Sequence, residues 1–271
     1  MKSIKITVQD FTGVYAEQPF MQGLRKSATT NSEIHWFDCT QIDGTDCYCD
    51  DEAQAILSQQ IESVRNKNSF GIHFFDNGNY HYMSKLWTDQ VQEPFNLVVF
   101  DHHPDMQPPR FEGILSCGGW IKEVLDHNKF VQNVTVIGVA DHLVEEIRED
   151  LSQSGDVEIL NRVSFIRESE LDSLPAKSTF KTHNLPLYIS IDKDALNTQE
   201  AATNWDQGSL TFEQLAETLQ MLAQNKKILG IDICGERARD MGFEDTAAAD
   251  AMNNALNEKL FLLLTEFHGV Q

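Results

Sequence analysis

Seven short apolar runs recur along the chain, and they constrain its fold more than any other feature. They are nearly continuous and rich in β-branched residues, which is typical of strands buried on both faces of a parallel sheet. The runs lie at 3–8, 69–75, 96–100, 134–140, 163–166, 185–191 and 227–233. Helix-like stretches separate several of them, at 51–66, 118–128, 141–153 and 211–225, and a further helix is predicted at 245–267. The alternation predicts an α/β fold with a mainly parallel sheet.

The helix boundaries and the length of the chain add to this prediction. Asp141 and Thr211 are good N-cap residues. Gln214 follows Thr211 at the third position, as the Gln variant of a capping box rather than its strict form. The 271 residues fit one α/β domain or two small ones. Because no repeat, low-complexity linker or Pro/Gly/Ser-rich boundary divides the sequence, we predict a single domain over residues 1–271.

Composition excludes some partners. Hydrophobic residues make up 41% and charged residues 23%, as in ordinary globular proteins. The net charge of −21 argues against nucleic acid or an anionic membrane surface as the main partner. Solubility accounts for most of this charge, although it also suits cationic small molecules and divalent metals. No segment approaches the roughly 18 uninterrupted apolar residues of a membrane span.

Cysteine usage predicts a cellular compartment. The count of five is odd, and the N-terminus lacks the apolar region of a secretory signal. We therefore expect reduced thiols and a cytoplasmic protein. Cys47 and Cys49 form a C-x-C pair, a weak metal or redox signal, and a turn with two partly buried thiols is the favoured interpretation.

Acidic residues follow three of the predicted strands. The run at 96–100 leads into Asp101, the run at 185–191 into Asp192 and Asp194, and the run at 227–233 contains Asp232 shortly before Glu236. In open parallel sheets ligands bind outside the carboxyl ends of the strands. Three strands are therefore predicted to deliver carboxylates to one rim.

The spacing of these residues favours a metal site. Asp101, His103 and Asp105 alternate on an extended segment, so they can face one point while His102 turns away. Asp192 and Asp194 repeat the spacing. Either motif alone is better explained as strand-end acids that cap helices or face solvent, but both together favour metal. Carboxylates with imidazole suit Mn²⁺, with Zn²⁺, Fe²⁺ and Co²⁺ as alternatives. Four acids and one imidazole exceed the needs of one small cation, which indicates two ions sharing carboxylates.

These motifs resemble those of the ureohydrolases, the arginase and agmatinase family. "FDHHPDMQ" is similar to the family's Asp-x-His-x-Asp segment, and "SIDKDALN" to its Ser-x-Asp-x-Asp segment. "AATNWDQGSLTFEQL" looks like the family's downstream stretch, and "FDNGNYHYMS" falls where the family has a Gly-rich turn that ends in a metal-binding His. The resemblance extends in order from about Gly71 to Glu236.

The resemblance implies a three-layer α/β/α fold with a mainly parallel, roughly eight-stranded sheet and two Mn²⁺ ions per chain. Its implied metal ligands are His81, Asp101, His103, Asp105, Asp192 and Asp194. His73 is a rival for the first histidine, but its apolar strand predicts a core residue with a satisfied ring. His102 is predicted to support a ligand from behind or to be structural, rather than to bind metal itself.

The family further implies a hydrolase that cleaves a C–N bond of a guanidino or amidino compound through a metal-bridging hydroxide. Asp105, as a bridging ligand, would take part in proton transfer, and Glu236 would pair with a cationic substrate. Glu236 matches the family's late glutamate only with a slip of one residue. Lys193, between two of the implied ligands, is predicted to point away or to bind a neighbouring carboxylate.

Two further residues are candidates for substrate binding. Cys117 lies in "SCGGW", where the family carries a proton-shuttling histidine, and Gly118 and Gly119 would let the backbone approach a ligand. The alternative for Cys117 is a small side chain that fills space under a helix start. Asp206, beside Trp205, either lines the pocket or belongs to a loop that leads to a helix.

Three functions remain open from the sequence. The first is the guanidino or amidino hydrolase, the second is a metal-dependent hydrolase of another linear amide, and the third is a non-enzymatic metal- or ligand-binding protein on the same scaffold. A small, cationic substrate is the expected partner, without nucleic acid or membrane, and a homo-oligomer is left open.

Overall fold

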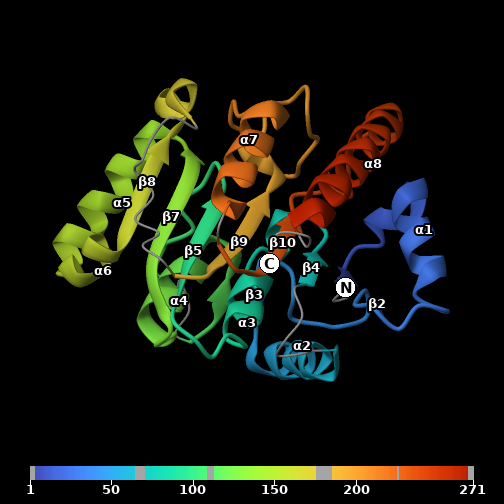
Figure 1. The fold of residues 1–271 in the computed structure, drawn as a ribbon, viewed down its shortest axis with the longest axis horizontal. Helices are drawn as coiled ribbons and strands as arrows, with labels where there is room; N and C mark the ends of the chain where they lie inside the picture. The colour runs from blue at the N-terminus through green and yellow to red at the C-terminus, as the bar shows by residue number, and fades with distance from the viewer. Residues whose placement is uncertain (1–3, 65–70, 109–112, 175–184, 225, 268–271) are drawn as a thin grey trace.

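Eight parallel strands form the central sheet of the computed structural model, which describes residues 4–64, 71–108, 113–174, 185–224 and 226–267 (Figure 1). Their spatial order is β2-β1-β4-β10-β9-β5-β7-β8. The bounds are β1 Lys5–Asp10, β2 Ile34–Asp38, β4 Gly71–Phe74, β5 Phe95–Phe100, β7 Val131–Val139, β8 Val163–Arg167, β9 Leu187–Asp192 and β10 Ile228–Cys234. The predicted mainly parallel, roughly eight-stranded sheet is confirmed. A separate antiparallel pair joins β3 (Tyr48–Cys49) to β6 (Leu115–Ser116).

Helices cover both faces of this sheet. They are α1 Pro19–Ser27, α2 Asp51–Val64, α3 Met83–Thr88, α4 Trp120–His127, α5 Asp141–Ser154, α6 Val157–Arg162, α7 Phe212–Ala223 and α8 Phe243–Glu266. One hydrophobic cluster joins the sheet to α1, α7 and α8, and a second joins the other face to α2 through α6. This is the predicted three-layer arrangement. The last two residues of the helix expected at 51–66 lie outside the described residues.

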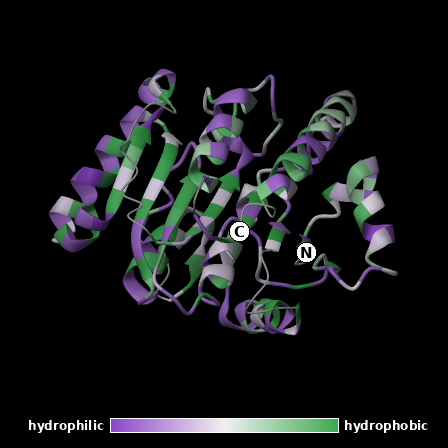
Figure 2. Ribbon diagram, in the orientation of Figure 1, coloured by the Kyte–Doolittle hydropathy of each residue, from purple (hydrophilic) through white to green (hydrophobic). Residues whose placement is uncertain are grey.

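The two clusters follow from the alternation of side chains along each strand. On β5, Val98 and Phe100 pack with the first cluster, whereas Leu97 and Val99 pack with the second. Both faces of the central strands are therefore apolar, and Figure 2 shows these strands as mostly hydrophobic between helices of mixed character. Within the part of the chain that the structure describes, no helix combines the length and the apolar character needed to cross a membrane.

The two predicted helix starts have different outcomes. Thr211 caps α7, and its hydroxyl accepts from the Gln214 backbone N–H while the Gln214 side chain accepts from the Thr211 N–H. This is the capping box in its Gln form. The prediction for Asp141 was wrong, because Ala140 is the N-cap and Asp141 is the first residue of α5. The Asp141 carboxylate accepts hydrogen bonds from Ser169 instead.

Of the eight strands in the central sheet, β2 was not predicted, and neither was the short pair β3 and β6 outside it. Strand β2 pairs with β1 at the edge of the sheet, and its residues after Ile34 are only half-buried or exposed. An edge strand does not need the continuous apolar run that marks a central one, so "IHWFD" gives a weak signal.

Candidate metal centre

The candidate ligands gather at the carboxyl ends of neighbouring strands. Asp101 directly follows β5, and Asp192 is the last residue of the adjacent β9. Asp194 lies in the short 3-10 turn Lys193–Ala195, and His81 directly follows the 3-10 turn Gly78–Tyr80. The rim is where an open parallel sheet binds its ligands.

Asp232 does not join this rim, contrary to the prediction. It lies within β10, where it contacts His73 Nδ1 at 2.7 Å and accepts from the Tyr188 hydroxyl at 2.8 Å. The His73 ring also stacks on Trp87 with centroids 3.5 Å apart. His73 is therefore the satisfied core histidine that the sequence predicted.

Backbone amides hold the acidic side chains in place. The N–H of His103 donates to Asp101 Oδ1 at 2.6 Å, and the N–H of Asp194 donates to Asp192 Oδ1 at 3.0 Å. The N–H of His102 donates to Asp194 Oδ1 at 3.1 Å, which connects the two motifs. Such bonds fix the carboxylates before any ligand arrives.

Asp105 is positioned by a turn and by a tryptophan. Its φ is +48°, in the left-handed region that Asp tolerates better than most residues. The indole N–H of Trp120, at the start of α4, donates to Asp105 Oδ2 at 2.7 Å. The Asp105 carbonyl also accepts from the N–H of Ile121. Asp105 is thus held between the loop and α4.

A first group of ligands surrounds His81. Its Nδ1 lies 3.1 Å from Asp101 Oδ2, 3.0 Å from Asp105 Oδ2 and 3.5 Å from Asp192 Oδ2. Despite these approaches, Nδ1 and Asp101 Oδ2 are buried without a hydrogen bond. The other ring nitrogen, Nε2, contacts the Ser190 hydroxyl at 2.9 Å. A buried imidazole with one nitrogen tethered and the other unbonded among carboxylates is the usual posture of a metal ligand.

A second group surrounds His103. Its Nδ1 lies 3.0 Å from Asp194 Oδ2 and 3.4 Å from Asp101 Oδ1, and its Nε2 lies 3.1 Å from Asp206 Oδ1. Asp101 therefore turns one oxygen towards each histidine and is common to both groups, whereas Asp105 belongs to the first. The sequence had suggested Asp105 as a bridging ligand, whereas the residue whose two oxygens face the two histidines is Asp101.

The crowding of these acids shifts their pKa values. Burial, together with the charge of Asp101, raises the pKa of Asp105 to about 7. Burial and the charges of Asp192 and Asp101 raise the pKa of Asp194 well above its usual range. For Asp101, burial is outweighed by His103 and His81, which hold its pKa below the ordinary value. Four carboxylates in one buried place repel one another, and cations would relieve this repulsion.

The donor set fits divalent ions. Asp101, Asp105, Asp192 and Asp194 carry a charge of −4 when ionised, and two divalent ions would carry +4. Carboxylate oxygens and imidazole nitrogens are ligands that Mn²⁺ accepts. The unbonded Nδ1 of His81 and Oδ2 of Asp101 are buried atoms that an ion would satisfy.

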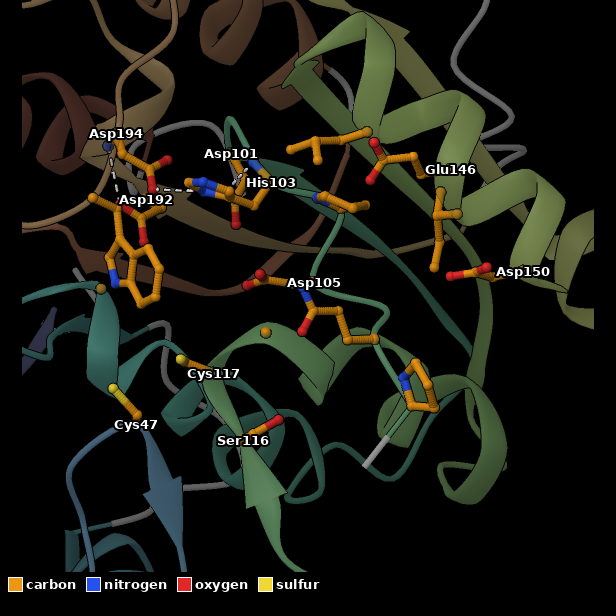
Figure 3. Close-up of a pocket in the computed structure, with 18 of the residues that line it drawn as sticks. Cys47, Asp101, His103, Asp105, Ser116, Cys117, Glu146, Asp150, Asp192 and Asp194 are labelled. Atoms are coloured by element: carbon orange, nitrogen blue, oxygen red, sulfur yellow. Dashed lines mark hydrogen bonds and ion pairs between the residues drawn. The ribbon is translucent and has the colours of Figure 1, made fainter. Parts of the chain in front are cut away.

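A cavity of about 520 Å³ opens onto the candidate ligands (Figure 3). Asp101, His103, Asp105, Asp192 and Asp194 line it, together with Cys117, Cys47, Gln107, Trp205, Glu146 and Asp150. Its size is within the range of small-molecule sites. Figure 3 shows Glu146 and Asp150, both from α5, on the side of the cavity away from Cys47. These two carboxylates were not predicted, because their helical segment carries no motif.

Cys117 lines this cavity, as one of its two sequence interpretations expected. Its backbone N–H donates to the carbonyl of Cys47 at 2.9 Å, and both thiols reach the cavity. Gly119, two residues after Cys117, has a different role from the one predicted. A Cβ at Gly119 would lie 2.8 Å from the Gln107 carbonyl, so the glycine admits the neighbouring loop rather than a ligand.

Glu236 lies outside this cavity. Its carboxylate is ion-paired with Lys193 and accepts from Gln18, Asn253 and Asn257 at 2.8 to 2.9 Å. The side chain is 0% exposed, so the protein itself occupies the oxygens that were expected to meet a substrate. Lys193 binds a neighbouring carboxylate, which is one of the two alternatives predicted for it.

Asp206 is the exposed neighbour of His103, and His102 is its buried neighbour. The Asp206 side chain is 71% exposed and contacts His103 Nε2. Asp206 does not line the cavity, although its neighbour Trp205 does. His102 is buried, lies 3.8 Å from Asp206, and belongs to neither group of candidate ligands. Asp206 thus serves to orient the His103 ring.

Two His–carboxylate groups that share an aspartate, at the carboxyl ends of parallel strands, define a candidate metal-binding α/β protein. The chain belongs to the arginase family, whose model matches residues 22–251. An uncharacterised protein from Thermotoga maritima is 28% identical over 233 residues, which are 85% of this chain and 79% of that protein.

Solved structures share the fold. Proclavaminate amidino hydrolase from Streptomyces clavuligerus superposes with a TM-score of 0.63 at 16% identity, over 94% of this chain and 91% of that one. A formiminoglutamase from Trypanosoma cruzi, solved with Mn²⁺, gives a TM-score of 0.62 at 11% identity, over 93% and 91% of the two chains.

Proposed function

We propose that this protein is a manganese-dependent hydrolase that cleaves a C–N bond of a small guanidino or amidino compound at a binuclear site. The observation that carries the proposal is the matched posture of His81 and His103. In each ring Nε2 is tethered by a protein oxygen and Nδ1 faces carboxylates. Membership of the arginase family, and the printed names of related structures, support the class of reaction.

The candidate ligands fall into two sets, one for each ion. His81, Asp105 and Asp192 would hold one, His103 and Asp194 the other, with Asp101 shared. When bound, such ions supply Lewis acidity and an activated water for attack on a trigonal carbon. Mn²⁺ suits the oxygen and imidazole donors, and it is the ion named for the related formiminoglutamase structure.

The protein groups around the cavity have distinct tasks in this proposal. Trp120 holds Asp105 at the cavity surface, where its carboxylate can carry a proton to the leaving amine. Asp206 holds His103, and Ser190 holds His81. Cys117 faces the substrate as a contact residue. We further propose that the protein acts in the cytoplasm, where its five free thiols stay reduced.

The charge of the cavity supports a cationic substrate. Glu146 and Asp150 line the cavity in addition to the candidate ligands, and their carboxylates remain negative when the ions neutralise the others. A protein of net charge −21 also attracts small cations.

One observation favours a second candidate, a hydrolase of another linear amide. Glu236, which the family resemblance had implied as the partner of a guanidinium, is buried against Lys193. Among the described residues, no other carboxylate replaces Glu236 as a partner for a guanidinium beside the candidate ligands. Glu146 and Asp150 would then bind a cationic group of the substrate that lies away from the bond to be cleaved.

A substrate screen tests the proposal. The Mn²⁺-loaded protein is assayed for urea or ammonia release over guanidino and amidino compounds, with a parallel panel of linear amides. The control is Asp101→Asn, which keeps the shape of the shared ligand and removes its charge. Turnover of a guanidino or amidino compound by the parent alone supports the first candidate. Turnover restricted to amides supports the second, and metal binding without any turnover would leave a binding protein.

A further inference from the structure

Cys234 places a thiol beside the first group of candidate ligands. It is the last residue of β10 and lies opposite Asp192 in the register of the parallel pair β10–β9. Its side chain is buried, and its Sγ donates to Asp192 Oδ2 at 3.2 Å. No motif in the sequence pointed to this residue.

The glycine that follows lets the two strand ends approach each other. Gly235 has a φ of +90°, and a Cβ there would lie 2.4 Å from Asp192 Oδ1 and 2.6 Å from the backbone N of Lys193. Only a residue without a side chain fits this position. Cys234 and Asp192 are paired in register on parallel strands, so their side chains lie on the same face of the sheet.

The thiol converges on the same space as His81. Ligand atoms of His81, Asp192 and Cys234 all lie within 4.8 Å of one another, and all three residues are buried. His81 Nδ1 has no hydrogen bond, although it is buried and surrounded by potential acceptors. An unpartnered ring nitrogen, a carboxylate oxygen and a sulfur thus face one small volume.

We infer that Cys234 is an additional ligand of the ion held by His81 and Asp192, and that it raises the affinity of this position for thiophilic ions such as Zn²⁺, Co²⁺ or Fe²⁺ above that of the His103 position. This inference rests on the proposed binuclear site. On binding, the S–H bond breaks, the proton leaves to solvent, and a sulfur lone pair forms the bond to the ion. Thiolate ligands favour these softer ions, whereas the His103 group offers only oxygen and nitrogen.

The other cysteines are placed differently. Cys39 and Cys49 are buried in the hydrophobic cluster under α2, and Cys47 and Cys117 meet at the cavity surface. Among the described residues, Cys234 is the cysteine that shares a group with candidate ligands. The competing role for its thiol is that of a hydrogen-bond donor that holds Asp192 in place.

Cobalt spectroscopy distinguishes the two roles. The metal-free protein is titrated with Co²⁺, and bound cobalt is counted by elemental analysis while the near-ultraviolet spectrum is recorded. We expect about two ions per chain and a sulfur-to-cobalt charge-transfer band. The band should disappear in both Cys234→Ala and Cys234→Ser, and it should persist in Cys117→Ser, the matched control for a nearby thiol.

A competition titration supplies the second readout. The preference of the parent for Zn²⁺ over Mn²⁺ should fall by about tenfold or more in Cys234→Ala. Two bound ions without a charge-transfer band, and with an unchanged preference, would overturn the inference and leave Cys234 as a hydrogen-bond donor with the proposed function intact. A parent that binds no ion would overturn the binuclear site itself.

Discussion

The buried ion pair between Lys193 and Glu236 gives the sharpest test of how the region behind the candidate site is built. Lys193 is 1% exposed although it stands between two candidate ligands in the sequence. Its ammonium pairs with Glu236 and also donates to Asn257 Oδ1 at 3.3 Å. Three amide side chains, from Gln18, Asn253 and Asn257, donate to the same carboxylate.

Lys193→Met removes the positive charge and keeps most of the volume of the side chain. Glu236 would retain its three amide donors but lose the cation that balances it. Breaking a buried pair on one side costs about 3–5 kcal/mol, because an uncompensated charge stays in the interior. For a chain of this size, that loss corresponds to a fall of roughly 10 °C in the melting temperature.

The assay is urea and thermal unfolding of the metal-free proteins. The control is Lys85→Met, which breaks a partly exposed i, i+4 pair with Asp89 and should cost about 0.5 kcal/mol or less. The double variant Lys193→Met with Glu236→Gln should recover a large part of the loss, because no unpaired charge remains. A cost below about 1 kcal/mol for Lys193→Met would refute the reasoning.

Glu236→Gln alone separates the structural role of this residue from the role that the family resemblance implied. The structural role predicts a lower melting temperature. A raised KM at an unchanged melting temperature would instead show that the carboxylate meets the substrate.

Three further predictions concern the site, the pH dependence and the cavity. Asp101→Asn and Asp194→Asn should each abolish tight binding of divalent ions, which metal analysis after Mn²⁺ loading measures. The circular dichroism of each metal-free variant should match that of the parent. Tight binding by either variant would exclude that residue as a ligand. Burial raises the pKa of Asp10 to about 6, so the stability it contributes is complete below the unfolded pKa near 4 and is lost as the pH rises through 6. Asp10→Asn removes this loss, so its stability relative to the parent should rise by up to roughly 3 kcal/mol between pH 4 and pH 8 in urea unfolding, and an equal difference at both pH values would contradict the assignment. Cys117→Ser should alter turnover or substrate preference with unchanged metal content and melting temperature. The control Cys39→Ser, in the core, should lower the melting temperature. A loss of stability alone in Cys117→Ser would show that this residue does not contact the substrate.

The fold could be predicted from the sequence because its central strands are buried on both faces. Each of the seven apolar runs corresponds to a strand of the sheet, and their alternation with helices sets the class. The short helices α3 and α6 were not predicted, because six residues are too few to show a helical period. The edge strand β2 was missed for a related reason, since only one of its faces needs to be apolar.

The candidate site was predictable only where its chemistry is encoded by local spacing. The Asp-x-His-x-Asp and Asp-x-Asp spacings are visible in the sequence and pointed to residues that the structure brings together. The extended backbone expected for them is not found, because Asp105 has a φ of +48° and Asp194 lies in a 3-10 turn. Trp120, Glu146 and Cys234 reach the site from α4, α5 and β10, and only the tertiary packing brings them there. Asp232 shows the converse, because its position near a strand end was visible while its partner His73 was not.

Lys193 lies between two candidate ligands in the sequence but points away from both. Asp192 and Asp194 face the histidines of the candidate site, whereas the Lys193 ammonium lies in the interior beside Asn257 of α8. An ammonium left without a partner there would be expensive to bury, and its most accessible anions would be the two flanking aspartates. Glu236 pairs with that ammonium instead, and Asn257 Oδ1 accepts a hydrogen bond from it at 3.3 Å, while the Asn253 amide donates to Glu236. The Lys193 charge is therefore balanced by Glu236 rather than by the two flanking aspartates, and the carboxylate of Glu236 contacts this lysine and three amides instead of the cavity.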